Sequence, residues 1–206
     1  NSYINWSQIE TFNEIDKLGN PIGKQYQYAA AYGGFNLLNI KKDVKVTPVE
    51  IDKDIINELQ CRSVMCFTGM SRESAKIIDS QIQSFKSGQN IEALDETKRL
   101  AKEISAAFEK GNIDEAGHLL DESWQYKKQF SSSITNRHIN SLYNGAISKG
   151  AIGGKVSGAG GGGFMYFICK YDRKVDVIQE LKKRGAEVTD FMFEPNGVTT
   201  WRSNFE

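Results

Sequence analysis

The spacing of hydrophobic residues divides the chain into a mixed first part, a long helical middle and a mixed end. In the first part, apolar positions spread over residues 1–19 predict one helix. The alanine-rich stretch 23–34 predicts a second helix that ends at its two closing glycines. Residues 35–40 and 44–51 predict a strand pair, and the nearly continuous apolar run 63–67 predicts a buried strand.

From residue 71 to residue 149 the apolar period becomes helical. The predicted helices carry their apolar faces at 77–85, 91–108, 113–130 and 136–149. Glycines separate the first three of them, at Gly88 and Gly111. The end of the chain predicts a strand, a helix and two further strands, at 164–169, 175–184, 187–193 and 198–201. Strands on both sides of a helical block indicate an α+β fold.

Composition narrows the classes of function. The chain has 206 residues, of which 39% are hydrophobic and 25% are charged, as expected of a globular protein with a sizeable core. Lysine plus arginine and aspartate plus glutamate both number 26, so the formal net charge is zero. This balance argues against a protein that binds nucleic acid or a membrane through a basic surface. No apolar run approaches the length of a membrane span.

The three cysteines do not form a disulfide framework, and their odd number favours a reducing compartment. With no signal-peptide pattern after Asn1, we expect a cytoplasmic protein. Only two histidines are present, so no zinc site of cysteines and histidines can be written, and no metal ligands are assigned in this chain. We expect both histidines, His118 and His138, to be structural or exposed to solvent.

The most unusual segment is KVSGAGGGGFMY, residues 155–166, with four consecutive glycines at 160–163. Such a run costs conformational entropy on folding, so it indicates a backbone requirement. A P-loop is excluded because no Lys-Ser/Thr pair follows the glycines. A dinucleotide loop is excluded because we expect a helix before these glycines and a strand after them, the reverse of that motif. Two readings remain: a phosphate-binding loop, or a loop that passes close under a neighbouring helix.

Four segments together resemble the GHMP kinases, the superfamily that includes galactokinase, homoserine kinase and mevalonate kinase. The resemblance is strongest to the branch of D-glycero-D-manno-heptose 7-phosphate kinases. The segments are GKQYQYAAAYGGFN (23–36), FTGMSRESAKIID (67–79), WQYKKQFSSSIT (124–135) and GAIGGKVSGAGGGGF (150–164). They occur in the family's order and span most of the chain.

The resemblance implies a two-lobed fold. Residues 1–54 look like the end of the N-terminal, nucleotide-binding lobe, and residues 55–206 look like the C-terminal lobe with an antiparallel sheet and a helical block. The family's second motif, a P-x-x-x-G-L-G-S-S-like loop that cradles the ATP phosphates, does not occur in this sequence. The chain therefore resembles only the later part of such a kinase.

The function that the resemblance implies is transfer of a phosphoryl group from ATP, with Mg²⁺, to the anomeric hydroxyl of a phosphosugar such as a heptose 7-phosphate. The phosphosugar and ATP are the expected partners. The glycine-rich segment would then help to shape the phosphate pocket, through Ser157, Gly158, Gly160, Gly161, Gly162 and Gly163.

The family's K-Q-D-Q-Y segment reads Lys24-Gln25-Tyr26-Gln27-Tyr28 in this chain. Tyr26 thus occupies the position of the family's catalytic aspartate, and a phenol with a pKa near 10 is a poor base and a poor magnesium ligand. By the same resemblance, Lys24 would face the substrate or the transferred phosphate, and Gln25 would contact the substrate. A large loss of activity relative to the family is expected.

Three further positions, Ser71, Arg72 and Lys127, allow two explanations each. Ser71 and Arg72 are either a helix cap and a surface arginine, or contacts to a substrate phosphate at a helix N-terminus. Lys127 belongs either to a solvated helix face or, with Ser131, to the substrate contacts that the resemblance implies.

Two alternatives to a heptose kinase stay open at this stage. A degenerate or partial kinase would bind a sugar phosphate or a partner without turnover, as the missing nucleotide loop and Tyr26 suggest. A galactose-type or fucose-type sugar is the other possibility, because C-terminal lobes of the relatives vary in substrate.

Overall fold

The computed structural model describes residues 24–41, 43–71 and 74–199. These residues form two compact units: residues 24–50 with 193–199, and residues 51–192. The segment 193–199 therefore associates with the first unit, whereas the sequence analysis placed it with the second lobe. The division into kinase lobes stays a prediction. The expected helix over residues 1–19 lies outside the described residues.

The first unit contains α2 (Gln25–Tyr32), β1 (Asn36–Ile40) and β2 (Val44–Pro48). The two strands pair antiparallel, as predicted, from Asn36 opposite Pro48 to Ile40 opposite Val44. Helix α2 ends at Gly33, where φ is +63° and a Cβ atom would overlap the backbone of Asn196. The returning tail is held there by hydrogen bonds from Gly34 N–H to the Glu194 carbonyl and from Val198 N–H to the Ala31 carbonyl.

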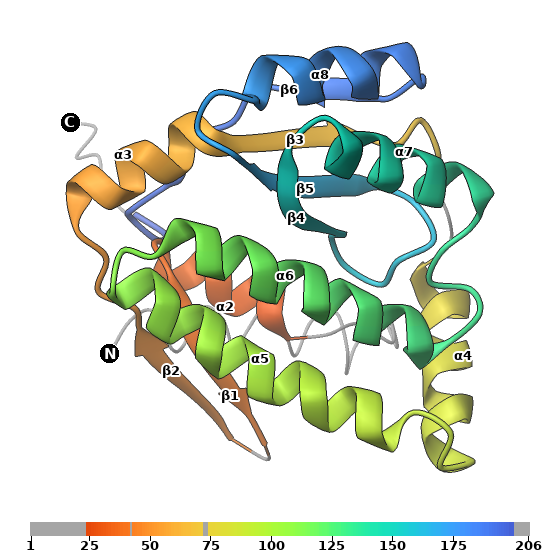
Figure 1. The fold of residues 1–206 in the computed structure, drawn as a ribbon. Helices are drawn as coiled ribbons and strands as arrows, with labels where there is room; N and C mark the ends of the chain where they lie inside the picture. Colours follow the sequence, from red (N-terminus) through yellow and green to blue (C-terminus); the bar gives the residue numbers. More distant parts are fainter. Residues whose placement is uncertain (1–23, 42, 72–73, 200–206) are drawn as a thin grey trace, which may run out of the picture. The chain divides into compact units, whose positions relative to one another are not determined.

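The second unit is built on an antiparallel sheet with the strand order β4-β5-β3-β6 (Figure 1). The strands are β3 (Ser63–Phe67), β4 (Ala151–Val156), β5 (Phe164–Cys169) and β6 (Glu187–Thr189). Strand β3 coincides with the buried strand predicted from its apolar run. Its alternate residues Val64 and Cys66 point into the main core. Strand β4 contains an irregularity in its pairing with β5 between Ala151 and Gly153.

Helices cover this sheet and confirm the predicted helical block. They are α3 (Lys53–Arg62), α4 (Ser74–Lys86), α5 (Ile91–Glu109), α6 (Ile113–Lys127), the 3₁₀ turn η2 (Lys128–Phe130), α7 (Arg137–Ser148) and α8 (Lys174–Lys183). Asn112 and Asn136 cap α6 and α7 with their side-chain oxygens. Helices α5 and α6 lie side by side, and α6 also packs against β4 (Figure 1). The mixed helix-and-antiparallel-sheet architecture is the α+β fold that the sequence predicts.

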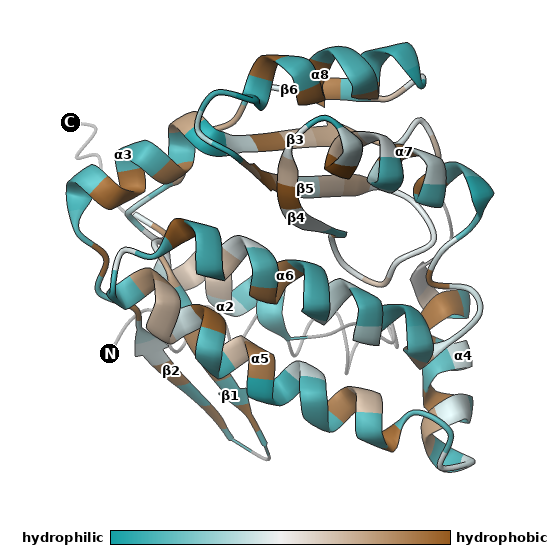
Figure 2. Ribbon diagram, viewed as in Figure 1, coloured by the Kyte–Doolittle hydropathy of each residue, from teal (hydrophilic) through white to brown (hydrophobic). Residues whose placement is uncertain are grey.

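The core of the second unit joins α6, α7 and the sheet through aromatic rings. Trp124 and Phe167 are fully buried, and the ring of Tyr143 lies between them, with centroids 6.0 and 5.8 Å away. The Tyr143 hydroxyl donates to Asp121, and burial raises the pKa of Tyr143 above its ordinary value. Figure 2 shows hydrophobic residues gathered in the central strands and hydrophilic ones on much of α5 and α8.

Strand β4 corrects the expectation that a helix directly precedes the glycine-rich segment. That segment joins two neighbouring antiparallel strands. The glycines of AIGGKV resemble a loop in sequence, but close packing requires them in the strand. A Cβ atom at Gly153 would overlap the Gly117 carbonyl of α6, and one at Gly154 would lie 2.5 Å from the Tyr166 carbonyl oxygen. The dinucleotide motif stays excluded, because a strand follows the loop.

Three further segments differ from the expectations. Helix α3 occupies a stretch to which the sequence analysis assigned no element. The strand expected over 187–193 is regular only at Glu187–Thr189. Residues 198 and 199 belong to no strand, and residues 200 and 201 lie outside the described residues.

Candidate functional site

The glycine-rich loop, residues 157–163, connects β4 to β5 and requires glycine at several positions. The angle φ is +72° at Gly158, +103° at Gly160 and +75° at Gly161, conformations that other residues rarely adopt. A Cβ atom at Gly162 would lie 2.6 Å from the Met70 carbonyl oxygen, and one at Gly160 would lie 3.0 Å from that of Ile134. Close packing is therefore one reason for the glycines.

Hydrogen bonds tie the second half of the loop to two other segments. Gly161 N–H donates to the Ile134 carbonyl over 2.7 Å, and Gly163 N–H donates to the Met70 carbonyl over 2.8 Å. Thr68 N–H in turn donates to the Gly163 carbonyl over 2.9 Å. Three segments that are distant in sequence, around residues 68–70, 134–136 and 157–163, thus meet in one place.

Other amides of the loop remain available to a ligand. Within the part of the chain that the structure describes, the backbone N–H groups of Gly158, Ala159, Gly160 and Gly162 have no hydrogen-bond acceptor. An unpaired backbone N–H is a good donor to an anion, and glycine allows close approach. The geometry therefore supports both explanations of the loop: some of its glycines are required by close packing, and some of its amides are available to bind a phosphate.

Lys127, in the last turn of α6, is buried against the start of this loop. Its exposed fraction is 9%, so the explanation by a solvated helix face is wrong. Its Nζ atom donates to the carbonyl oxygens of Gly158, over 2.5 Å, and Val156, over 3.2 Å. Burial, and then the charge of Lys155, lowers the pKa of Lys127 to about 7.

Lys155 is a residue of this site that sequence reasoning did not select. It lies on β4, opposite Tyr166 of β5 and two residues before the loop, and it is only partly exposed. Burial lowers its pKa as well. The available signal was a charged residue inside AIGGKV, a segment whose other residues are buried.

Two predicted serines lie on segments near the loop. The Ser131 hydroxyl is buried and shares a 2.6 Å hydrogen bond with that of Ser80 on α4. Ser71 is exposed just before α4. Ser157 is exposed, and its N–H donates to the Phe164 carbonyl. Arg72 lies outside the described residues. Their contacts with a substrate stay predictions.

Lys24, Gln25 and Tyr26 lie in the first unit, at the start of α2. Tyr26 is 54% exposed, and desolvation raises the pKa of its phenol above 10.0. A phenol with this pKa carries its proton at neutral pH and does not accept another. The catalytic role of this position stays a prediction.

The two histidines have the structural and solvent-exposed positions that the sequence predicts. His138 Nε2 lies 2.9 Å from the Thr68 carbonyl oxygen, and His118 is exposed. All three cysteines are free. In the described ranges, no three side chains of histidine, cysteine, aspartate or glutamate are grouped to hold a metal ion. No described helix combines the length and hydrophobicity needed to cross a membrane.

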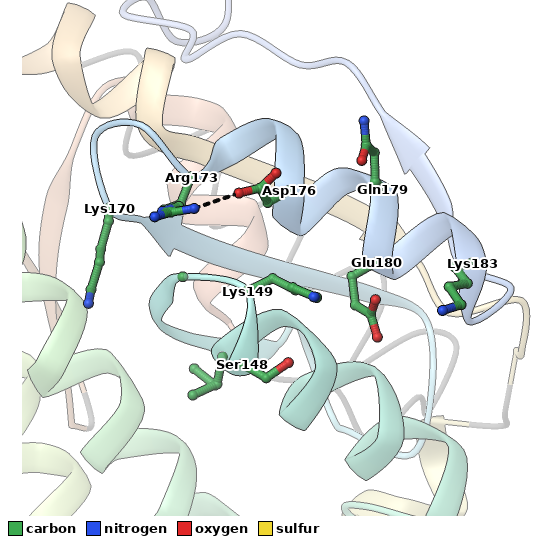
Figure 3. A pocket seen from close by; sticks show the side chains of 10 residues that line it. Ser148, Lys149, Lys170, Arg173, Asp176, Gln179, Glu180 and Lys183 are labelled. Atoms are coloured by element: carbon green, nitrogen blue, oxygen red, sulfur yellow. Dashed lines mark hydrogen bonds and ion pairs between the residues drawn. The ribbon is translucent and has the colours of Figure 1, made fainter.

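A separate cavity of about 610 Å³ lies between the C-terminal end of α7 and helix α8 (Figure 3). It adjoins Gly150, at the end of β4 opposite to the glycine-rich loop. Its charged side chains are Lys149, Lys170, Arg173, Asp176, Glu180 and Lys183. Arg173 pairs with Asp176, and Glu180 pairs with Arg184 outside the lining. These six side chains are exposed or only partly buried, so we assign this cavity no function.

Comparison with known proteins gives consistent results. Residues 104–187 match the family of GHMP kinases C terminal domains. The chain is 36% identical over 191 residues to a D-glycero-alpha-D-manno-heptose 7-phosphate kinase of Campylobacter jejuni, covering 92% of this chain and 56% of that protein. The chain thus spans little more than half the length of this relative.

Solved structures agree with the sequence comparison. A sugar kinase from Campylobacter jejuni is 34% identical with a TM-score of 0.71, over 96% of this chain and 56% of that one. A D-glycero-D-manno-heptose 1-phosphate kinase from Bacteroides thetaiotaomicron is 30% identical with a TM-score of 0.72, over 97% and 55%. The loop, the sheet and these similarities show that residues 104–187 contain a GHMP kinase C-terminal domain, within a chain that is similar over most of its length to heptose-phosphate kinases.

Proposed function

We propose that the protein is a sugar kinase that transfers the γ-phosphoryl group of ATP, with Mg²⁺, to the anomeric hydroxyl of a phosphosugar similar to heptose 7-phosphate. This chain would supply the C-terminal part of the enzyme. The names of two relatives, one a heptose 7-phosphate kinase and one a heptose 1-phosphate kinase, support a heptose phosphate.

The single observation that carries the proposal is the loop at 157–163, with its four amides that find no acceptor among the described residues. Phosphoryl transfer depends mainly on positioning and on neutralising charge on the phosphate oxygens. The loop amides would donate to those oxygens. Lys127 would hold the first residues of the loop in place through its bonds to Val156 and Gly158.

The remaining site residues have proposed roles of two kinds. Lys24 and Gln25 would contact the substrate, as would Ser71, Arg72 and Ser131. Tyr26 would stand beside the reacting hydroxyl without deprotonating it. Mg²⁺ would enter as the companion of the nucleotide, and we assign no step to it.

A second candidate is a protein that binds a phosphosugar without turnover. The raised pKa of Tyr26, at the position of the family's aspartate, favours it. This candidate shares the loop and the substrate contacts, and it differs only in the chemical step.

The test is a coupled assay of ADP release by the intact protein, with heptose 7-phosphate, galactose and fucose as alternative acceptors. The kinase proposal expects turnover that depends on the phosphosugar. Binding of heptose 7-phosphate by calorimetry without turnover would contradict it and support the second candidate.

A further inference from the structure

Two lysines, Lys127 and Lys155, meet beside the glycine-rich loop. Lys127 reaches the loop from α6, and Lys155 comes from β4, which packs against that helix (Figure 1). Among the described residues, neither ammonium group forms an ion pair with a carboxylate. Lys155 also has no hydrogen-bond acceptor in the described part of the chain.

Such an arrangement is unfavourable for the free protein. A buried charge without a counter-ion carries a large desolvation cost, and two like charges repel each other. Burial lowers the pKa of both Lys127 and Lys155, and the charge of Lys155 lowers the pKa of Lys127 further. An anion bound between the lysines would remove both penalties.

The surroundings also select the kind of anion. Lys127 lies against Gly158, the first of the loop residues whose amides lack acceptors. Two ammonium groups match the two negative charges of a phosphate monoester, and backbone amides match its several oxygens. A carboxylate would leave most of these donors unused.

We propose that Lys127 and Lys155, together with the amides of Gly158, Ala159, Gly160 and Gly162, form one binding site for a phosphate dianion. The site deepens the proposed function, because the phosphate belongs either to the phosphosugar or to the nucleotide. Lys155 is the new element of this site.

The first experiment titrates the intact protein with inorganic phosphate and follows the amide NMR signals of residues 158–162. The substitution Lys155→Met should weaken phosphate binding at least tenfold, the usual effect of losing one charge-assisted hydrogen bond. Lys102→Met removes one equally charged but exposed lysine of α5 and should leave binding unchanged. Lys155→Arg keeps the charge and should retain most of the binding.

An unchanged phosphate affinity in Lys155→Met, or shifts centred away from the loop, would overturn the proposal. Because Lys155→Met keeps the side-chain volume, its folding is checked by the same NMR spectrum. If that variant does not fold, the charge-conserving Lys155→Arg decides: it must bind phosphate, and it must lose binding when Lys127→Met is added.

Steady-state kinetics separate the two sources of the phosphate. A rise in KM for the phosphosugar at unchanged KM for ATP assigns the site to the sugar phosphate, and the reverse assigns it to the nucleotide. No change in either would overturn the proposal. Because phosphate binding is measured without ATP or sugar, a protein that binds phosphate through both lysines and transfers none contradicts only the kinase function.

Discussion

The Nζ atom of Lys127 lies 2.5 Å from the carbonyl oxygen of Gly158, so the end of α6 and the start of the glycine-rich loop are joined directly. The same atom donates to Val156, the last residue of β4. The buried amine of Lys127 thereby holds both the last residue of β4 and the start of the glycine-rich loop. The loop reaches the candidate site already held at both ends, since Gly161 and Gly163 bond to Ile134 and Met70.

The first prediction concerns pH and Lys127. Its pKa is about 7 in the folded protein and near 10.5 in the unfolded chain, so above pH 7 the unfolded state binds more protons. This residue therefore makes the protein more stable as the pH rises from 7 to 10. Relative to Lys127→Met, the free energy of unfolding of the wild type should increase by about 2 kcal/mol between pH 7 and 9. Urea unfolding at both pH values measures it, and a constant difference between the two proteins would contradict it.

The second prediction concerns the close approach of β4 and α6. In Gly153→Ala, the added methyl group would overlap the Gly117 carbonyl and lie 2.8 Å from Asp121 N. We expect a loss of about 3 kcal/mol in the free energy of unfolding, at the upper end for overpacking. Gly185→Ala is the control, because its methyl group meets nothing within 4 Å. Its φ of +88° should cost about 1 kcal/mol. Equal losses would show that β4 can move away from α6.

The third prediction concerns two arginines with similar partners and different burial. Arg62 is 6% exposed, donates to the Cys169 carbonyl and pairs with Glu58 and Asp114. Arg62→Ala would leave a buried acceptor and two carboxylates without a partner and should cost about 3 kcal/mol in thermal or urea unfolding.

Arg99 is the matched control for this prediction. It pairs with Glu96, Glu103 and Glu122, but its side chain is 43% exposed. Arg99→Ala should therefore lower the stability much less than Arg62→Ala does, because exposed ion pairs contribute little. A larger effect at Arg99 than at Arg62 would refute the ranking by burial.

The fourth prediction concerns Tyr26. Because its phenol keeps its proton at neutral pH, replacing it by a carboxylate should supply a base and raise kcat with the phosphosugar at least tenfold. The measurement is the coupled ADP assay on Tyr26→Asp in the intact protein. Tyr26→Phe removes the hydroxyl without adding a base and should leave kcat within about twofold. If Tyr26→Asp is no faster, the carboxylate has no part in the reaction.

The sequence predicted helices and strands correctly where the spacing of hydrophobic residues was regular. The apolar run of β3 and the helical spacing of α5, α6 and α7 correctly predicted these elements, because burial of one face requires such patterns. Strand β4 was missed because its glycines are required by close contacts with Gly117 and Tyr166, which are distant in sequence. Local strand propensity does not depend on such contacts, so it could not predict the strand.

The candidate site, too, could be predicted from the sequence only in part. The glycine-rich loop is visible in the sequence as a run of one residue type. The burial of Lys127 and the nearness of Lys155 depend on how α6 packs on β4, so they needed the structure. The contacts proposed for Ser71, Arg72 and Ser131 stay predictions.

The pairing of β4 with β5 sets which way Lys155 points. Lys155 lies opposite Tyr166, and its neighbour Val156 lies opposite Met165 in the main core. Successive residues of a strand face opposite sides, so Lys155 leaves the sheet on the side opposite to Val156. The irregularity at Ala151 and Gly153 inserts one residue, Ile152, between two flanks that keep this alternation. Deleting Ile152 should therefore restore a regular ladder and leave the lysine opposite Tyr166, whereas a deletion after position 155 would shift the loop itself.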